Sequence, residues 1–382
     1  MEGEKKYWQA VKENIRGWLS LEGARKNIEV RFGIDLSKLT DKIKSDLLNR
    51  PLPKNLIWIH YLGSVILLLF VIQVITGTAL SFYYKPTPDE AHTSIKYIMN
   101  YVPYGWLIRS IHYWAANLMI LSLLFHLARV YFMGAYKNPR EFLWVSGVFN
   151  LGIIIAFGFT GYILPWDQIS YWATTTLTSE IGDLPLIGKY IMLSIRGGEE
   201  VGSGTLTRFF VGHIMILPAA LCSLILVHIL VVARQGISPL WWKQKVTNPS
   251  HESQPRTFFP HASLDFAIIM FTLFALLMGL AVFFPTGLPD KANPLEIPAE
   301  IKPEWYLLFL YQFYRVLPVK ILFIKRVVLF AIPFIIFIIV LFSVPFSDIS
   351  EELHPLKRRL FTGLGTFALL FFLTFTLWGL FS

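Results

Sequence analysis

Four histidines lie inside two long apolar segments of this chain, where a titratable side chain is costly. Each segment carries two of them: His112 and His126 lie in the first, and His213 and His228 lie in the second. A polar side chain inside a membrane normally faces the interior of a helix bundle and has a partner there. Along a helix, 14 residues return nearly to the same face, about 21 Å further on, and 15 residues stay within roughly 60° of it. If the two helices run in the same direction, the spacing predicts two stacked sites of two imidazoles each.

The ligand set favours haem over zinc at these sites. Zinc needs three or four ligands, and no carboxylate or cysteine stands near the four histidines on their two segments. Two axial imidazoles suit a six-coordinate haem iron, whose apolar macrocycle fits between helices. The single cysteine, Cys222, excludes an intrachain disulfide, a cysteine-rich iron–sulfur site and a CxxCH haem attachment. A non-redox transporter whose histidines relay protons is the alternative that this chemistry leaves open.

Glycines on two further apolar segments repeat the same spacing. Gly63 and Gly77 are 14 residues apart, as are Gly147 and Gly161. A residue without Cβ lets a porphyrin edge approach a helix closely, and small residues also let helices pack tightly in membranes. We interpret the four glycines as haem-contacting positions, with ordinary helix packing as the alternative.

Arginines stand within one or two helical turns of the histidines. Arg109 precedes His112 by three residues, and Arg129 follows His126 by three. We predict that both guanidinium groups pair with haem propionates. For Arg208, five residues before His213, pairing with a propionate and snorkelling of a helix-end side chain explain the position equally well.

The remaining composition predicts the scaffold that positions these side chains. Of 382 residues, 54% are hydrophobic and 15% are charged, and mean hydropathy is +0.54, whereas soluble domains carry roughly 25% charged residues. This excludes disorder and disfavours a soluble enzyme. Seven segments can each cross about 30 Å of hydrocarbon: residues 57 to 82, 107 to 132, 142 to 166, 209 to 233, 264 to 284, 327 to 346 and 360 to 381. We predict an all-α polytopic membrane protein, with a four-helix dihaem bundle followed by three further helices.

The charge distribution predicts the topology. The formal net charge is +9, but the basic residues form no patch interleaved with aromatic residues, so no nucleic-acid partner is expected. If the N-terminus is cytoplasmic, 22 Lys and Arg lie on that side and 12 on the other, as the positive-inside rule favours. Residues 1–55 lack the apolar core of a signal peptide, and their apolar spacing from Trp8 to Leu19 predicts an amphipathic helix on the membrane surface. The predicted domains are 1–55, 56–240, a linker at 241–262, and 263–382.

Two long connections on the opposite side are candidates for holding a site. Residues 167–208 and 285–326 are too long for tight turns and too apolar for free linkers. In the second, Glu304 opens an apolar and aromatic stretch, where a carboxylate should have a raised pKa and can accept a proton. Proline followed by glutamate is also an ordinary helix start.

At this point the motifs resemble a known family. Their order along the chain matches cytochrome b of quinol:cytochrome c oxidoreductases from about residue 45 to the C-terminus: RSIHYW from Arg109, GYILPWDQISYW from Gly161, TLTRFF from Thr205 and PEWY from Pro303, with the four histidines. Three features resemble the cytochrome b6 plus subunit IV branch, here fused in one chain. They are the 15-residue histidine spacing, the segments WLIRSIH and PWDQISYW, and seven rather than eight helices.

The resemblance implies a mechanism and a set of partners. Quinol would be oxidised in a pocket where Glu304 takes a proton and Tyr306 and Tyr162 line the wall. One electron would pass to a Rieske iron–sulfur protein. The other would cross two non-covalent b-type haems to a quinone near the cytoplasmic face, coupled to proton translocation. A c-type cytochrome subunit, a homodimeric complex, membrane lipid and a bacterial-type cytoplasmic membrane are implied as well.

Two positions depart from the cytochrome b6 pattern. Tyr61 stands where that branch has a cysteine that tethers an extra haem, so no covalent haem is expected. Near the inner quinone site, Ala233 occupies the family's basic position, with Arg234 beside it. The alternative function is a dihaem, quinone-reactive membrane anchor of a dehydrogenase or hydrogenase. That function does not explain the presence of the PEWY segment.

Overall fold

The computed structural model describes residues 58–236, 238 and 262–382, with Lys5, Lys6, Gln9, Asp41 and the backbone of four more residues. The chain separates into two compact units. The first comprises Met1–Leu56 and Asn248–Ile268, and in it β1 (Pro51–Leu52) pairs antiparallel with β2 (Arg256–Thr257). Apart from Gln9, the expected amphipathic helix from Trp8 to Leu19 lies outside the described residues, and the bounds of the four predicted segments stay predictions.

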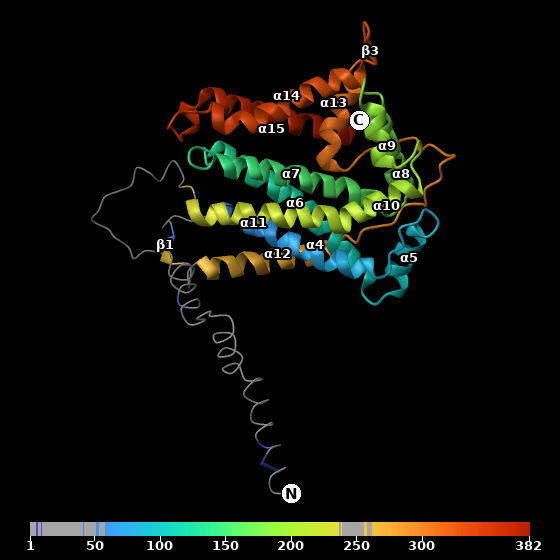
Figure 1. Ribbon diagram of the computed structural model, residues 1–382, viewed down its shortest axis with the longest axis horizontal. Coiled ribbons are helices and arrows are strands. Elements are labelled where there is room, and N and C mark those ends of the chain that lie inside the picture. The colour runs from blue at the N-terminus through green and yellow to red at the C-terminus, as the bar shows by residue number, and fades with distance from the viewer. Residues whose placement is uncertain are drawn as a thin grey trace, which may run out of the picture. The chain divides into compact units, whose positions relative to one another are not determined.

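The second unit, Ile57–Thr247 with Ile269–Ser382, contains the helix bundle. Within the described residues seven helical segments are long and apolar enough to cross a membrane, which confirms the predicted fold class. They are α4 (Leu62–Ser81, preceded by η2, Trp58–Tyr61), α6 (Gly105–Phe132), α7 (Glu141–Tyr162), the continuous α10, η3 and α11 (Ser203–Val211, Gly212–Ile216, Leu217–Gln235), α12 (Ser263–Phe283), α14 (Arg326–Ser347) and α15 (Arg359–Phe381). In Figure 1 the long helices of this unit run side by side.

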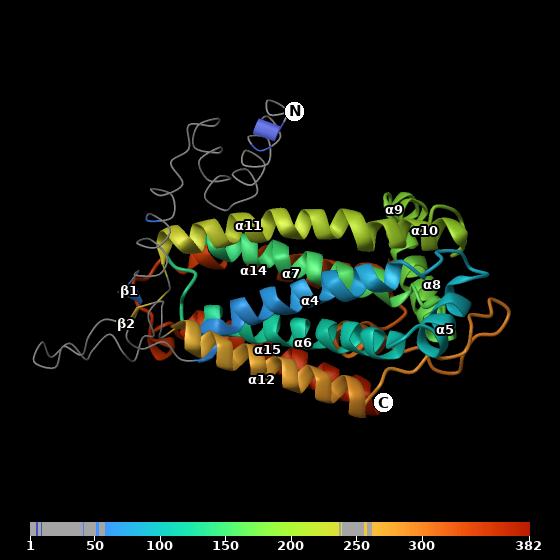
Figure 2. The same cartoon turned by 90° about the horizontal axis from the view of Figure 1, so that it is seen from below.

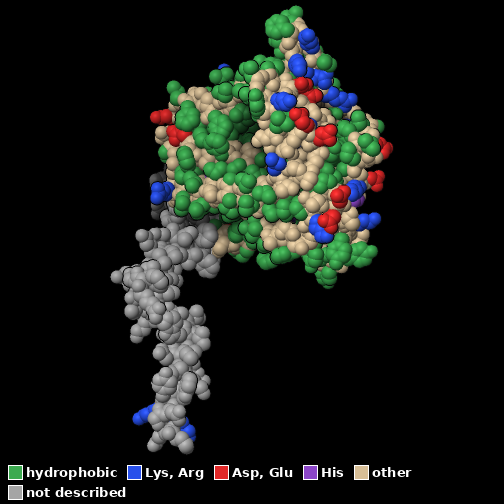
Figure 3. All heavy atoms as spheres, turned by 45° about the vertical axis from the view of Figure 1, so that its right-hand side comes forward, with side chains coloured by type: hydrophobic (Ala, Val, Ile, Leu, Met, Phe, Trp, Pro, Cys, Tyr) green, Lys and Arg blue, Asp and Glu red, His purple; other side chains and the backbone are tan. Residues whose placement is uncertain are grey.

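These segments are helical because a membrane leaves a backbone few other choices. In hydrocarbon every N–H and C=O must be satisfied within the segment, and a helix does this. Pro333 and Pro345 lie inside α14, as membrane helices tolerate. Figure 3 shows hydrophobic side chains over the exposed sides of the bundle and most charged side chains toward its ends. The long helices are therefore apolar on the faces that neighbouring helices leave uncovered.

The predicted four-helix half is built from two packed pairs. Helix α4 packs on α6, and α7 packs on α11 (Figure 2). Leu69, Ala115 and Leu221 are completely buried between them. Hydrogen bonds between residues far apart in the sequence join the three-helix half to this core. For example, Trp114 Nε1 donates to the Phe284 carbonyl at 2.8 Å. The histidines and glycines singled out above all belong to this four-helix half.

The two long connections form ordered structure at one end of the bundle, which we call the Glu304 end. The first contains α8 (Gln168–Gly182) and α9 (Gly188–Arg196). The second contains η6 (Trp305–Leu307), α13 (Leu308–Val316) and the hairpin of β3 (Lys320–Ile321) and β4 (Ile324–Lys325). A further helix, α5 (Ala91–Tyr101), lies in the connection between α4 and α6. At the opposite end, η7 (Pro355–Lys357) precedes α15.

Candidate functional site

The structure brings together His112 and His213, one from each histidine-bearing helix. We call them the first histidine pair, and His126 with His228 the second. His112 lies on α6 and His213 on η3, and their ring centres are 6.4 Å apart with an interplanar angle of 67°. A metal held between two imidazoles by metal–nitrogen bonds of about 2 Å leaves the ring centres roughly 6 Å apart. Within the described residues no group of three or more His, Cys, Asp or Glu side chains gathers. Two imidazoles are therefore the donors that the described residues bring to this position, and their role as haem ligands stays a prediction.

A π-helical turn accounts for the 15-residue spacing of the second histidine-bearing helix. His213 lies in η3, a five-residue π turn between α10 and α11. Such a turn inserts one extra residue into an α-helix, and it often occurs at functional sites. The 15 residues from His213 to His228 are thus equivalent to about 14 α-helical residues. The angular offset from His213 to His228 therefore becomes similar to that between His112 and His126, which are 14 residues apart on α6.

Hydroxyl groups on the flanking helices determine which imidazole nitrogen carries the proton. Thr76 Oγ1 lies 2.9 Å from His112 Nδ1, and Thr160 Oγ1 lies 3.1 Å from His213 Nδ1. Each hydroxyl already donates its only proton to a backbone carbonyl of its own helix, at 2.7 and 2.8 Å. The hydroxyl oxygen must then accept from Nδ1–H. This leaves Nε2 unprotonated, which is the state that ligates a metal.

The four glycines each face one histidine ring. A Cβ added at Gly161 would lie 2.7 Å from His213 Cε1, and one at Gly77 would lie 3.2 Å from His112 Cε1. Carbon atoms in contact normally stay about 3.5–4.0 Å apart. The structure therefore shows that these glycines make room for the imidazole rings. Their contact with a porphyrin edge stays a prediction.

The second histidine pair has looser surroundings. A Cβ added at Gly63 or Gly147 would lie 3.6 or 3.8 Å from His126 or His228 respectively, which is ordinary contact. Ser146 Oγ lies 2.8 Å from His228 Nδ1 and donates to the Leu143 carbonyl at 3.1 Å, so the same tautomer argument holds. His126 Nδ1 is buried and has no hydrogen-bond partner among the described residues.

The three predicted arginines have different neighbours. Arg109 donates from Nη1 to the Thr286 carbonyl at 3.1 Å, so it bridges α6 and the chain after α12. Arg208 is exposed and donates to the Gly204 carbonyl of its own helix at 3.2 Å. Arg129 donates from Nη2 to the Ser238 carbonyl at 3.4 Å, while its buried Nε has no partner among the described residues. The buried Nε–H of Arg129 is an unused donor of the kind that a propionate takes.

The Glu304 end holds the second predicted constellation. Glu304 immediately precedes η6, and Tyr306 is buried with its hydroxyl against Gly158 of α7. Burial raises the pKa of Glu304, and the negative charge of Asp167 raises it further. Burial also raises the pKa of Asp167, although its carboxylate accepts the backbone N–H groups of α8. A carboxyl with a raised pKa at an interior position can take up a proton from a bound substrate.

Both predicted tyrosines lie near this carboxylate. Tyr162 at the end of α7 and Tyr306 both interact electrostatically with Glu304. Tyr113 of α6 does so too, and sequence reasoning did not find it. Trp305 Nε1 donates to Asn117 Oδ1 at 2.7 Å, which fixes η6 against α6. Tyr113 follows His112 directly in RSIHYW, so its position beside a candidate haem ligand was the available signal.

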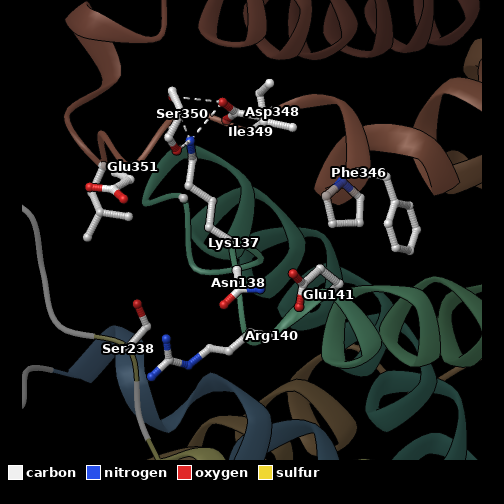
Figure 4. Close-up of a pocket in the computed structure, with 13 residues that line it drawn as sticks. Lys137, Asn138, Arg140, Glu141, Ser238, Phe346, Asp348, Ile349, Ser350 and Glu351 are labelled. Atoms are coloured by element: carbon white, nitrogen blue, oxygen red, sulfur yellow. Dashed lines mark hydrogen bonds and ion pairs between the residues drawn. The ribbon is translucent and has the colours of Figure 1, made fainter.

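A pocket at the opposite end was also not predicted (Figure 4). It has a volume of about 740 Å³, and its lining includes Lys137, Arg140, Ser238 and Asp348. Lys137 Nζ contacts Asp348 Oδ1 at 2.7 Å on one wall, and the Arg140 side chain lies toward Ser238 on the other. The buried Nε of Arg140, like that of Arg129, has no partner among the described residues. The two unused donors suit an anionic group at this end.

A buried ionic cluster ties the two sequence halves together beside this pocket. Asp348 accepts from Lys137, from the Tyr136 hydroxyl at 2.6 Å and from Arg358 Nη1 at 3.1 Å. Burial raises the pKa of Asp348, but the hydrogen bonds outweigh it and hold the pKa below its usual value. Its partners are 211, 212 and 10 residues away. No local sequence pattern signals such a cluster.

Known proteins show the same organisation. The family model "Cytochrome b/b6/petB" matches residues 47–236, and "Cytochrome b(C-terminal)/b6/petD" matches residues 291–381. The cytochrome bc complex cytochrome b subunit of Chlorobaculum thiosulfatiphilum is 38% identical over 366 residues, which is 95% of this chain and 80% of that protein. Cytochrome b6 of Prochlorococcus marinus strain MIT 9215 is 43% identical over 205 residues, which is 54% of this chain and 92% of that protein.

A solved structure agrees with these matches. A chain of the "Hyperthermophilic respiratory Complex III" superposes with a TM-score of 0.79 at 28% identity, covering 93% of this chain and 90% of that one. The fused form predicted from the resemblance fits the relatives, since one matches nearly the whole chain and the other only its first half. The chain belongs to the cytochrome b/b6 family, as the cytochrome b subunit of a bc-type complex.

Proposed function

We propose that this subunit oxidises quinol at the Glu304 end, carries electrons across the membrane between two b-type haems and reduces a quinone at the opposite end, with coupled proton translocation. The observation that carries the proposal is the His112 and His213 pair. Its ring centres are 6.4 Å apart, and the hydroxyl partners of its Nδ1 atoms leave both Nε2 atoms available for a metal. The membership in a bc-type family supports the same reading.

The chain's own residues would bind the two haems without covalent attachment. His112 and His213 would hold one, and His126 and His228 the other. Bound haem would supply one-electron transfer. Arg129 would neutralise a propionate with its free Nε–H. Arg109 and Arg208 already bond to backbone carbonyls, and we keep their pairing with propionates as a proposal.

Glu304 would act as the proton acceptor for quinol. Its raised pKa lets it take a proton from a hydroxyl within reach and release it again toward water. Tyr162 and Tyr306 would line the pocket, and their rings would exclude water from the reacting groups. Tyr306 is held by its contact with Gly158, where a Cβ would clash with its hydroxyl.

The family membership also supports the partners. We propose a Rieske iron–sulfur protein as the electron acceptor at the Glu304 end, with a c-type cytochrome after it, in a homodimeric complex. The seven spans make this a multi-pass membrane protein. We propose the bacterial-type cytoplasmic membrane, with the N-terminus in the cytoplasm, from the distribution of Lys and Arg.

Replacing Glu304 by glutamine tests the proposal. In the purified complex, Glu304→Gln should slow quinol oxidation by about 10²-fold, because the proton acceptor is lost. Both haem signals should remain in reduced-minus-oxidised spectra. Glu300→Gln is the matched control, since Glu300 belongs to the same connection and its side chain is 63% exposed. Wild-type turnover of Glu304→Gln would remove Glu304 from this role.

A further inference from the structure

A short hairpin projects from the side of the bundle at the Glu304 end. Strands β3 and β4 pair antiparallel, with Lys320 opposite Lys325 and Ile321 opposite Ile324. Leu322 and Phe323 form the two-residue turn between them. In Figure 1 the hairpin, labelled β3, points across the long helices and extends beyond α14 and α15. It thus points sideways from the bundle instead of along the helix axes.

The residues at the tip are unusual for a turn. Two-residue hairpin turns favour Asn, Asp and Gly, because the backbone needs positive φ. Here Leu322 has φ of +54°, and Leu322 and Phe323 are 82% and 83% exposed. Val319, just before the hairpin, is 72% exposed. The tip thus carries large apolar side chains where a turn facing water would favour small polar residues. Such a tip is suited to an apolar medium.

Basic residues surround this apolar tip. Residues 305–347 contain four Lys and Arg and no Asp or Glu. Lys320 and Lys325 stand directly opposite each other, an arrangement that is unfavourable for like charges in water. Lys325 pairs with Asp183 at 3.1 Å, but both side chains are about 60% exposed, and such surface pairs contribute little. Lys320 has no ion pair among the described residues. The base of the hairpin therefore presents net positive charge.

The chain path places the hairpin at a membrane boundary. Helix α14, one of the seven spans, begins at Arg326, directly after β4. The base is also held in place, since Arg326 lies over the Tyr314 ring at 5.4 Å and Tyr314 hydrogen-bonds to Glu180 of α8. Figure 3 shows hydrophobic side chains at the end of the projection, with Lys and Arg below them.

We propose that this hairpin is a lipid anchor, whose apolar tip inserts into the membrane interface while Lys320 and Lys325 bind anionic phospholipid headgroups. An apolar tip with flanking lysines is the combination by which peripheral segments bind such surfaces. Long basic side chains can keep their charges at the headgroups while their stems lie along apolar groups. Through Arg326 and Tyr314 the anchor would hold α8 and the Glu304 end at a defined depth.

Site-directed fluorescence tests the depth of the tip. The single cysteine makes this practical: in a Cys222→Ser background, Phe323→Cys carries an environment-sensitive fluorophore, and the complex is placed in nanodiscs. Lipids with brominated acyl chains should quench this label several-fold more than a label at Leu295→Cys. Leu295 belongs to the same connection and is 95% exposed. It should instead be quenched by aqueous iodide.

The charge requirement is tested in the same nanodiscs. With phosphatidylglycerol present, Lys320→Gln combined with Lys325→Gln should reduce quenching of the Phe323→Cys label to the level found in phosphatidylcholine alone. Equal quenching with and without these lysines would overturn the role of anionic lipid. If iodide quenches the label at position 323, the tip is in water and the insertion proposal is wrong. If neither quencher reaches the label, another protein chain covers the tip and the proposal is also wrong. Unchanged haem content in each variant would show that the bundle has folded.

Discussion

The two histidine pairs share one sequence pattern but have different surroundings. At the Glu304 end, both Nδ1 atoms have hydroxyl partners, and two glycines lie so close that an added Cβ would be 2.7 or 3.2 Å from a ring carbon. At the opposite end, one Nδ1 has no partner among the described residues, and the corresponding distances are 3.6 and 3.8 Å. The similar spacing along the two helices therefore does not determine the groups that surround each ring.

The acidic groups differ between the two ends as well. Glu304 is half-buried and Asp167 is buried, and the pKa values of both are raised, that of Glu304 partly by the negative charge of Asp167. Asp348 at the opposite end accepts from four side-chain donors, Lys137, Tyr136, Arg358 and Ser350, and its pKa is lowered. A carboxyl with a raised pKa keeps its proton to higher pH and can exchange it with a substrate, whereas one held ionised by cations acts as a fixed charge. This difference supports our proposal of proton exchange at Glu304, whereas the hydrogen bonds of Asp348 give it a structural role.

The strongest test of the comparison removes one ligand. His112→Ala should abolish one of the two b-haem signals in reduced-minus-oxidised spectra and leave the other, because the pairs lie at separate ends. His126→Ala should abolish the other signal only. An unchanged haem content in His112→Ala would disprove the ligand assignment, and loss of both signals would show that the two pairs are not independent.

Adding a single methyl group tests how tightly each ring is held. Gly161→Ala should destabilise the haem-loaded protein by about 1–3 kcal/mol, since the new Cβ must displace His213. Gly147→Ala is the matched control, because its Cβ would meet His228 at an ordinary distance. Thermal loss of the haem spectrum measures both. Equal losses in the two variants would contradict the difference between the ends.

The pH dependence of quinol oxidation tests the acidic pair at the Glu304 end. Glu304 must be ionised to accept a proton, so the rate should rise with pH through its raised pKa. Asp167→Asn removes the negative charge that raises this pKa, so the rising limb should move to lower pH. Asparagine keeps the side-chain oxygen that caps α8. A limb that does not move would mean that Asp167 has no influence on the titrating group.

The smallest expected effect concerns the hydroxyl partners. A hydrogen bond from Nδ1–H makes an imidazole a more basic ligand, which favours the more positive oxidation state of a metal. Thr160→Val should therefore raise the midpoint potential of the haem at the Glu304 end by about 40 mV, the one-electron equivalent of about 1 kcal/mol. Ser146→Ala should shift only the other haem. A redox titration in which either variant shifts both potentials equally would argue against local control.

The helix count and the histidine pairs were predictable because both depend on local periodicity. Seven apolar stretches of sufficient length can only be satisfied as helices in hydrocarbon, and all seven are present in the structure. The spacing of His112 and His126 likewise follows from the helical repeat. The sequence could not predict that the 15-residue spacing of His213 and His228 includes a π turn. A π turn such as Gly212–Ile216 has no local sequence pattern that distinguishes it from continuous α-helix.

By itself the sequence determined the helical fold class, the candidate ligands and the position of Glu304 at the start of an aromatic segment. The tertiary structure alone decided which groups surround them. Asp167 reaches Glu304 across 137 residues, and Asp348 meets Lys137 across 211. It also decided that the glycines face imidazole rings and that Thr76 and Thr160 orient them. The physical reason is that periodicity depends on neighbours along the chain, whereas burial and charge pairing depend on neighbours in space.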